Sequence, residues 1–251
     1  MAKQKGPVKL SGTIGDLTFY ESGNQHLVKL KNGPTREEVL TKKEYVRTLE
    51  NSNEFGPCAS AGKLIRTALE LVGSHLTDPT MVNRLTERLT RVMQSDTASQ
   101  RGTRRVQRGQ LSILKNFEFL KEARMADSFF APYEAAFDRA IGTGTITIPS
   151  FMPKASLVLP PHATRVKLVA TALALDFEKG RTQKAVSASE PLRLDNSLTE
   201  PITLTCAFEA PTELPIILVL GLQFMEEHEG FCYPMREKEY NATAIVLAEK
   251  V

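Results

Sequence analysis

Residues 214–225 read LPIILVLGLQFM, and this stretch decides the fold. Six of the seven residues from Ile216 to Leu222 are aliphatic, and apolar and polar positions do not alternate. A strand with one face in water alternates, whereas a strand covered on both faces does not. A bilayer takes about 20 apolar residues to cross, so the run is too short for that. We therefore predict a central strand of a buried sheet and no membrane insertion.

Four more stretches in the second half are rich in Val, Ile, Thr, Leu and Phe and are bounded by Pro, Gly, Asn and Asp, as strands are. They cover residues 137–151, 163–177, 198–208 and 240–250. Strands at this spacing predict an antiparallel β-sandwich of immunoglobulin-like or jelly-roll type over residues 142–251.

The segment before it, residues 35–141, is predicted to be helical. Thr35 and Glu38 have the spacing of a capping box, and the polar residues that follow fit a short exposed helix or an extended strap. A helix is expected over 57–72, with Pro57 in its first turn. The fold class predicted for the whole chain is α+β.

A second helix is predicted after Asp78 and Pro79, which suit the N-cap and the first helical position. Five apolar residues recur on one face of it: Val82, Leu85, Leu89, Val92 and Met93. A third helix is expected within residues 107–123.

Residues 1–34 are predicted to form a β-hairpin arm. Apolar and polar residues alternate on both sides of Gly23 and Asn24, which can supply a two-residue turn. A further short strand is expected just upstream, with a bend at Gly15. The apolar residues expected at an assembly interface are Ile14, Leu17, Phe19, Tyr20, Val28 and Leu30.

A two-stranded hairpin alone is marginally stable in water, so the arm must pack on something. One hypothesis is that it docks on the chain's own sandwich. The other is that it adds strands to an exposed sheet edge of a neighbouring copy, where its backbone hydrogen bonds would hold an oligomer together. Both hypotheses stay open on the sequence.

Residues 84–108 form a basic patch, with only Glu87 and Asp96 to oppose it. Positive patches bind phosphate backbones, but the aromatic residues expected of a single-strand binder are absent. Nucleic acid, an acidic surface of a partner subunit and plain solvent therefore remain three alternatives for it. Its arginines are Arg84, Arg88, Arg91, Arg101, Arg104, Arg105 and Arg108.

No motif predicts catalysis or a cofactor. GTIG at residues 12–15 lacks the lysine of a phosphate loop. MEEHEG at residues 225–230 offers metal-ligating side chains, but neighbours on a strand or turn point in different directions, so a solvated turn is expected. We predict no enzyme activity, no cofactor and no metal site.

The cysteines are Cys58, Cys206 and Cys232, which lie far apart in the sequence. An odd, scattered set fits reduced thiols, and two are expected in a β core. The four histidines are equally scattered, and each is expected at the surface or in a turn.

The net charge of +3 conceals an asymmetry. Residues 1–141 carry 22 Lys and Arg against 16 Asp and Glu, while residues 142–251 carry 10 against 13. Such halves favour head-to-tail contacts, which close into rings or continue as filaments. No apolar stretch follows the charged N-terminus, so a cytoplasmic location is expected, with release as an assembled particle as a further possibility.

Several motifs resemble a family of uncharacterised bacterial proteins of similar length. They are KLSGTIGDLTFYESG, TLENSNEFGPCASAGKLIRTAL, MVNRLTERLTRVMQSDTASQRG and TGTITIPSF. The resemblance covers nearly the whole chain and implies no activity, cofactor or functional residue. One departure is the second hairpin strand, which reads HLVKLKNG where similar sequences have a tyrosine and an arginine.

The sequence thus favours a non-enzymatic structural subunit that self-assembles into a homo-oligomer, tube or filament by N-terminal strand exchange and complementary charge. The alternative is a nucleic-acid-binding protein that uses the arginines of residues 84–108.

Overall fold

The computed structural model describes residues 2–30, 33–70, 80–209, 212–235 and 240–250. In that part the chain is α+β, as predicted, and its sheets are antiparallel. It forms two compact units, Met1–Leu49 and Glu50–Val251.

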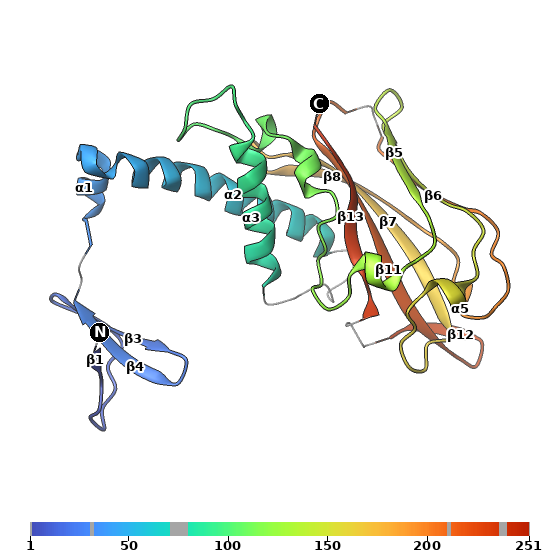
Figure 1. Ribbon diagram of the computed structural model, residues 1–251, viewed down its shortest axis with the longest axis horizontal. Coiled ribbons are helices and arrows are strands. Elements are labelled where there is room, and N and C mark those ends of the chain that lie inside the picture. The colour runs from blue at the N-terminus through green and yellow to red at the C-terminus, as the bar shows by residue number, and fades with distance from the viewer. Residues whose placement is uncertain (1, 31–32, 71–79, 210–211, 236–239, 251) are drawn as a thin grey trace. The chain divides into compact units, whose positions relative to one another are not determined.

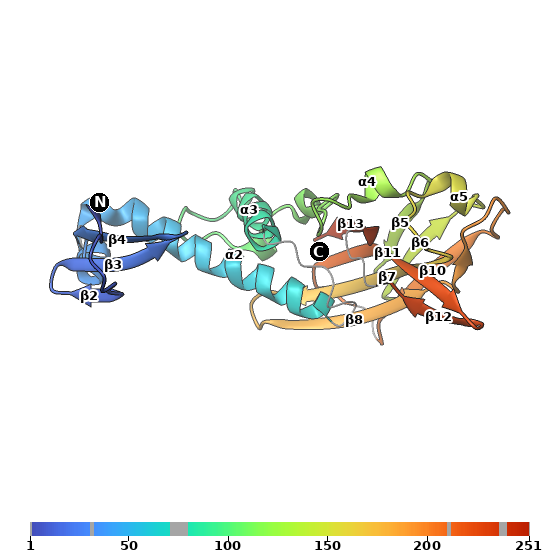
Figure 2. The ribbon, with the colours of Figure 1, turned by 90° about the horizontal axis from the view of Figure 1, so that it is seen from below.

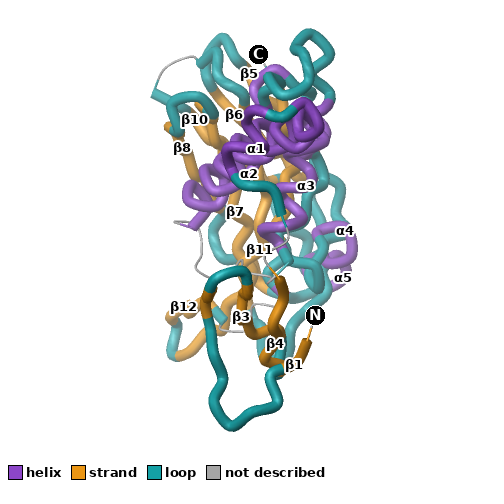
Figure 3. Tube along the Cα trace, turned by 90° about the vertical axis from the view of Figure 1, so that its left-hand side faces the viewer, coloured by secondary structure: helices purple, strands orange, loops and turns teal. Residues whose placement is uncertain are grey.

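The N-terminal unit contains a four-stranded sheet of order β1-β4-β3-β2 (Figure 3). Its strands are β1 (Ala2–Lys3), β2 (Gly12–Ile14), β3 (Leu17–Ser22) and β4 (Gln25–Leu30). The predicted hairpin and upstream strand are therefore confirmed. Gly15 and Gly23 begin the two tight turns with φ of 57° and 59°, a conformation that favours glycine.

Two short elements follow the sheet, α1 (Arg36–Thr41) and a 3₁₀ turn at Lys43–Tyr45. The capping box before α1 is present, because the Glu38 N–H donates to the Thr35 hydroxyl and the Thr35 N–H donates to the Glu38 carboxylate. The short exposed helix predicted there is thus confirmed.

The helix α2 (Val46–Glu70) begins eleven residues earlier than predicted and carries Pro57 inside it. The predicted helix is confirmed over residues 57–70, and its predicted end at residue 72 lies outside the described residues. The predicted start was wrong because proline usually marks a first turn. Glu50 and Glu54, in the added part, contact Arg101 and Arg104 from a distant loop. Such tertiary contacts support helix where local pattern does not.

The helix α3 (Met81–Gln94) confirms the second predicted helix, although Asp78 and Pro79 lie outside the described residues. Its buried face holds Met81 in place of the predicted Val82, which is 41% exposed. The other predicted members are buried: Leu85, Leu89, Val92 and Met93.

No long helix forms over residues 107–123. Two 3₁₀ turns, Val106–Arg108 and Leu111–Leu114, precede an extended segment that bonds to the last strand of the chain. Asn116 has a φ of 62°, which no α-helix allows. The buried apolar residues that suggested a helix instead pack against α3 and the sheet.

The sandwich consists of two antiparallel sheets (Figure 1). The smaller has the order β10-β6-β5, and the larger the order β12-β11-β7-β8, with β13 also paired to β11 and β9 to β7. The strands are β5 (Glu134–Asp138), β6 (Thr143–Ile148), β7 (Arg165–Asp176), β8 (Arg181–Ala188), β9 (Leu192–Arg193), β10 (Ile202–Ala207), β11 (Ile216–His228), β12 (Phe231–Pro234) and β13 (Thr243–Glu249); α4 (Met125–Ser128) and α5 (Pro153–Ser156) are single turns.

The predicted central strand is β11, which pairs with β7 on one side and with β13 and β12 on the other. Leu218 and Leu220 face the core shared with the smaller sheet. Ile217 and Val219 face the core shared with α2 and α3. Both faces are covered, which explains the missing alternation.

The predicted boundary between residues 141 and 142 falls inside the β5–β6 hairpin, where Gly142 has a φ of 67°. Apolar and polar residues alternate only weakly in β5, so the sequence of this segment does not predict a strand. Pairing with β6 places it in the sheet.

Candidate assembly interface

Five of the six residues predicted for the interface share one face of the N-terminal sheet. Residues directly opposite each other in an antiparallel pair point to the same side. The register pairs Ile14 with Leu17, Leu17 with Leu30, and Phe19 with Val28. We call these five residues the apolar face.

The apolar face is not covered by the rest of the N-terminal unit. Ile14 is 62% exposed, Leu30 58% and Leu17 40%, while Phe19 and Val28 are half-buried. Clustered exposed aliphatic side chains on a small sheet are typical of an interaction surface.

Tyr20 lies on the opposite face, because it pairs with Leu27. The Lys29 ammonium lies 5.4 Å from the centre of its ring. Tyr20 therefore does not share the apolar face with the other five residues predicted for the interface. Strict alternation along β3 separates it from Phe19.

The lysines of β1 and β4 project from the side away from the apolar face, whereas Glu21 and its cross-strand partner His26 lie on the same side as the apolar face. Lys29 pairs with Thr18 and Lys3 with Leu27, so both lysines project from the other side. The Lys9 ammonium is held in its loop by the carbonyls of Gln4 and Gly6. An identical sheet can therefore approach the apolar face without bringing lysine against lysine.

The edges of this sheet are short. β1 contributes two residues and β2 three, and both pair within the chain. Short edge strands are a common protection against edge-to-edge pairing. A small sheet can associate through its strand edges or through an apolar face. In this sheet the edges are short, and the apolar face is the larger exposed surface.

The predicted basic patch is divided between two places. Arg101, Arg104, Arg105 and Arg108 lie in the loop after α3. There Arg104 forms a bidentate pair with Glu54, and Arg101 contacts Glu50 and Asn51. Arg108 donates to the Ser99 hydroxyl and Arg105 to the Arg104 carbonyl. These four guanidinium groups hold the loop in place.

The other three arginines, Arg84, Arg88 and Arg91, line one side of a hollow of about 340 Å³ beside α3. Lys121 and Arg124 line its far side, so five cations surround it. The sequence does not predict Lys121 and Arg124 as members of a basic site, because only the fold brings them opposite α3.

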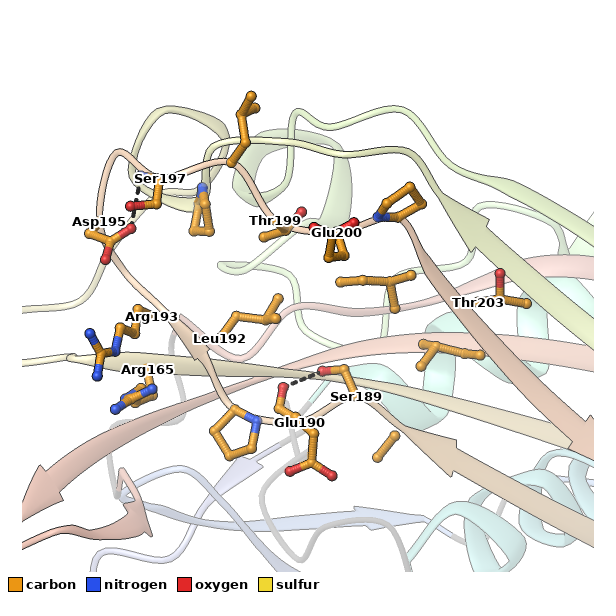
Figure 4. A pocket seen from close by; sticks show the side chains of 17 residues that line it. Arg165, Ser189, Glu190, Leu192, Arg193, Asp195, Ser197, Thr199, Glu200 and Thr203 are labelled. Atoms are coloured by element: carbon orange, nitrogen blue, oxygen red, sulfur yellow. Dashed lines mark hydrogen bonds between the residues drawn. The ribbon is translucent and has the colours of Figure 1, made fainter.

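A second hollow, of about 560 Å³, lies beneath the connection from β8 to β10 (Figure 4). Several of its polar side chains form hydrogen bonds or ion pairs within the chain. The Ser189 hydroxyl donates to the Glu190 carbonyl, and the Asp195 carboxylate accepts the Ser197 N–H. Arg165 pairs with Glu227 at 2.6 Å. The hydroxyls of Ser189 and Thr199 are hydrogen-bonded to backbone groups and not to a carboxylate of the lining.

The MEEHEG stretch forms the end of the β11–β12 hairpin, with Glu229 and Gly230 at φ of 51° and 83°. The predicted exposed turn is confirmed. Glu226 lies 3.1 Å from His228, and Glu227 turns away to Arg165. The described residues contain no cluster of three or more metal-ligating side chains.

Cys58 and Cys206 are buried, and burial raises the pKa of both thiols. Cys206 lies in β10 and Cys58 in α2, so only one of these two is in a β core as predicted. Cys232 is half-buried in β12.

No helix among the described residues has the length and apolar character needed to cross a membrane. Comparisons with protein-family models and with curated proteins give no match. Among solved structures, the chain is similar to one titled "pH-induced modulation of Streptococcus parasanguinis adhesion by Fap1 fimbriae", at 14% identity and a TM-score of 0.23, over 46% of this chain and 78% of that one. A likeness this weak carries no argument about function.

Proposed function

We propose that this protein is a non-enzymatic structural subunit that self-assembles through the apolar face of its N-terminal sheet. The observation that carries the proposal is the apolar face itself, with three aliphatic side chains between 40% and 62% exposed on one side of a four-stranded sheet. The occupant we propose is the same face of a second copy.

Physical chemistry supports a self-contact. Burying a Leu or Ile side chain contributes about 1.5–3 kcal/mol, and a twofold contact counts each residue twice. Lys3 and Lys29 lie on the other side of the sheet and do not oppose the contact. Glu21, on the apolar side, pairs with His26 beside the turn, at the far end of the hairpin from Leu17 and Leu30. Since β1–β4 already pair within one chain, face packing replaces the strand exchange expected from the sequence.

The nucleic-acid alternative is less well supported. Arg101, Arg104 and Arg108 are bonded to side chains of their own chain. A guanidinium group that holds a loop is not available to neutralise phosphates unless the loop opens.

The test is the double variant Leu17→Asp/Leu30→Asp, which places two carboxylates opposite each other at the centre of the apolar face. In sedimentation velocity we expect the variant to run as a smaller species than the wild type at the same concentration, because the contact through the apolar face is lost. Far-ultraviolet circular dichroism checks that the variant is folded.

The matched control is Thr18→Asp/Lys29→Asp, a cross-strand pair on the opposite face of the same two strands. It should sediment like the wild type. The proposal fails if both double variants dissociate equally, because the loss would then reflect the sheet's stability.

A further inference from the structure

The hollow beside α3 has the shape and charge of a receptor for carboxylates. Arg84, Arg88 and Arg91 recur on one face of α3, next to the face that holds the buried Leu85 and Leu89. The facing wall is formed by Asn116–Glu118, Lys121 and Arg124. We call this the cationic hollow.

Two of its arginines are anchored before any ligand arrives. The Arg84 guanidinium donates to the carbonyls of Glu118 and Phe119 at 2.7 and 3.2 Å and lies 5.3 Å from the centre of the Phe117 ring. Arg88 reaches the Ile113 carbonyl at 3.4 Å. Anchored cations lose little side-chain freedom when they bind an anion.

The carboxylates of the cationic hollow do not balance its cations. Glu87 pairs with Arg91 at 2.6 Å. Glu118 accepts the Met125 N–H, and its burial raises its pKa. Arg124 pairs with Asp127, outside the lining, at 3.5 Å. Two acidic and five basic side chains line the hollow, so an excess of positive charge remains around it. The fitting ligand carries carboxylates.

The end of the β11–β12 hairpin has that chemistry. Glu226 and Glu229 lie within four residues of each other, and no lysine or arginine pairs with either in the described part of the chain. Phe231 and Tyr233, next to them in β12, are 68% and 54% exposed. We call this the acidic hairpin end.

We propose that the cationic hollow of one copy binds the acidic hairpin end of another. Both lie in the second unit, and Figure 2 shows α4, which follows the hollow in the chain, and β12 on opposite sides of the sheets. One copy cannot close this contact on itself. A contact between two different surfaces continues from copy to copy as a ring or filament.

The test reverses charge on each side in turn. The hollow variant is Arg88→Glu/Lys121→Glu, and the hairpin variant is Glu226→Lys/Glu229→Lys. Both are made in the Leu17→Asp/Leu30→Asp background, so that the apolar face does not contribute. Each variant alone should associate at least about tenfold more weakly than that background, because its two surfaces then carry the same sign.

An equimolar mixture of the two variants should recover association, since each acidic hollow meets a basic hairpin end and each basic hollow an acidic one. The chain with all four reversals should also associate. Recovery in either case shows that the variants are folded. The control is Lys154→Glu/Lys179→Glu, which changes net charge equally at exposed positions outside the hollow and should leave association unchanged.

The proposal is overturned if the mixture stays monomeric, or if the hollow variant associates like its background. It is also overturned if a labelled single-stranded RNA binds the background protein in low salt and the hollow variant loses that binding while its self-association is intact. None of these outcomes depends on the apolar face, so this proposal and the proposed function fail separately.

Discussion

At the scale of single residues, the contact between Glu54 and Arg104 fixes the loop after α3. The Glu54 carboxylate is 5% exposed and accepts three hydrogen bonds of 2.7 Å, two from the Arg104 guanidinium and one from the Gly102 N–H. The bonds from Arg104 are the main reason that the pKa of Glu54 is lowered. A buried carboxylate satisfied in this way becomes costly when its partner is lost.

We predict that Glu54→Gln lowers the free energy of unfolding by about 3 kcal/mol, because Arg104 then stays buried without its counter-charge. Glu87→Gln, which breaks the exposed pair with Arg91, should cost less than about 1 kcal/mol. Urea denaturation at neutral pH measures both. Equal losses in the two variants would contradict this account of the loop.

The same variant predicts a pH dependence. A carboxylate whose pKa is lowered by folding contributes stability above its unfolded pKa, and that contribution is lost as pH falls through the folded value. The difference between wild type and Glu54→Gln should therefore shrink in acid.

Single residues also show where sequence reasoning ends. The seven arginines are visible as a group, but their partners are not. Arg104 meets Glu54 across 50 positions of the chain, and no local pattern records that distance. The place of Lys121 in the cationic hollow could not be predicted for the same reason, because it depends on contacts between distant parts of the chain.

At the scale of elements, the sequence predicted the helices and strands whose apolar residues follow a regular pattern. β11 was predicted because an unbroken aliphatic run fits a strand covered on both faces, and the buried face of α3 because its apolar residues recur with helical spacing. Residues 107–123 were mispredicted, since their buried leucines and phenylalanines serve two 3₁₀ turns and an extended segment. Apolar residues report burial more reliably than they report conformation.

The close packing of this irregular segment gives a prediction. A Cβ added at Gly109 would lie 1.9 Å from the Val92 carbonyl oxygen, at the end of α3. Gly109→Ala should therefore cost about 3 kcal/mol or more. Gly56→Ala, at an open helical position of α2, should instead stabilise the protein by about 0.5–1 kcal/mol. Thermal unfolding compares the two, and a neutral Gly109→Ala would refute the contact.

At the scale of the whole molecule, the N-terminal unit carries the apolar face on which the proposed self-assembly depends. Its hairpin and its apolar residues were predicted from alternation and glycine turns. The four-stranded sheet was not, because β1 joins only through the long-range pairing of Ala2 with Val28 and Lys3 with Leu27. The sequence suggested that the strands of this arm pair with the sheet of a neighbouring copy, but they pair with each other in the same chain. The apolar face of the sheet is then the part left exposed, and not the strand edges.

The most direct measurement of the central claim is the molar mass of the full-length chain across a concentration series, by sedimentation equilibrium. If the apolar face joins copies, the mass of the wild type rises above 27.8 kDa with concentration, and at each concentration it exceeds the mass of Leu17→Asp/Leu30→Asp. A wild-type chain that remains at 27.8 kDa throughout the micromolar range would contradict the account.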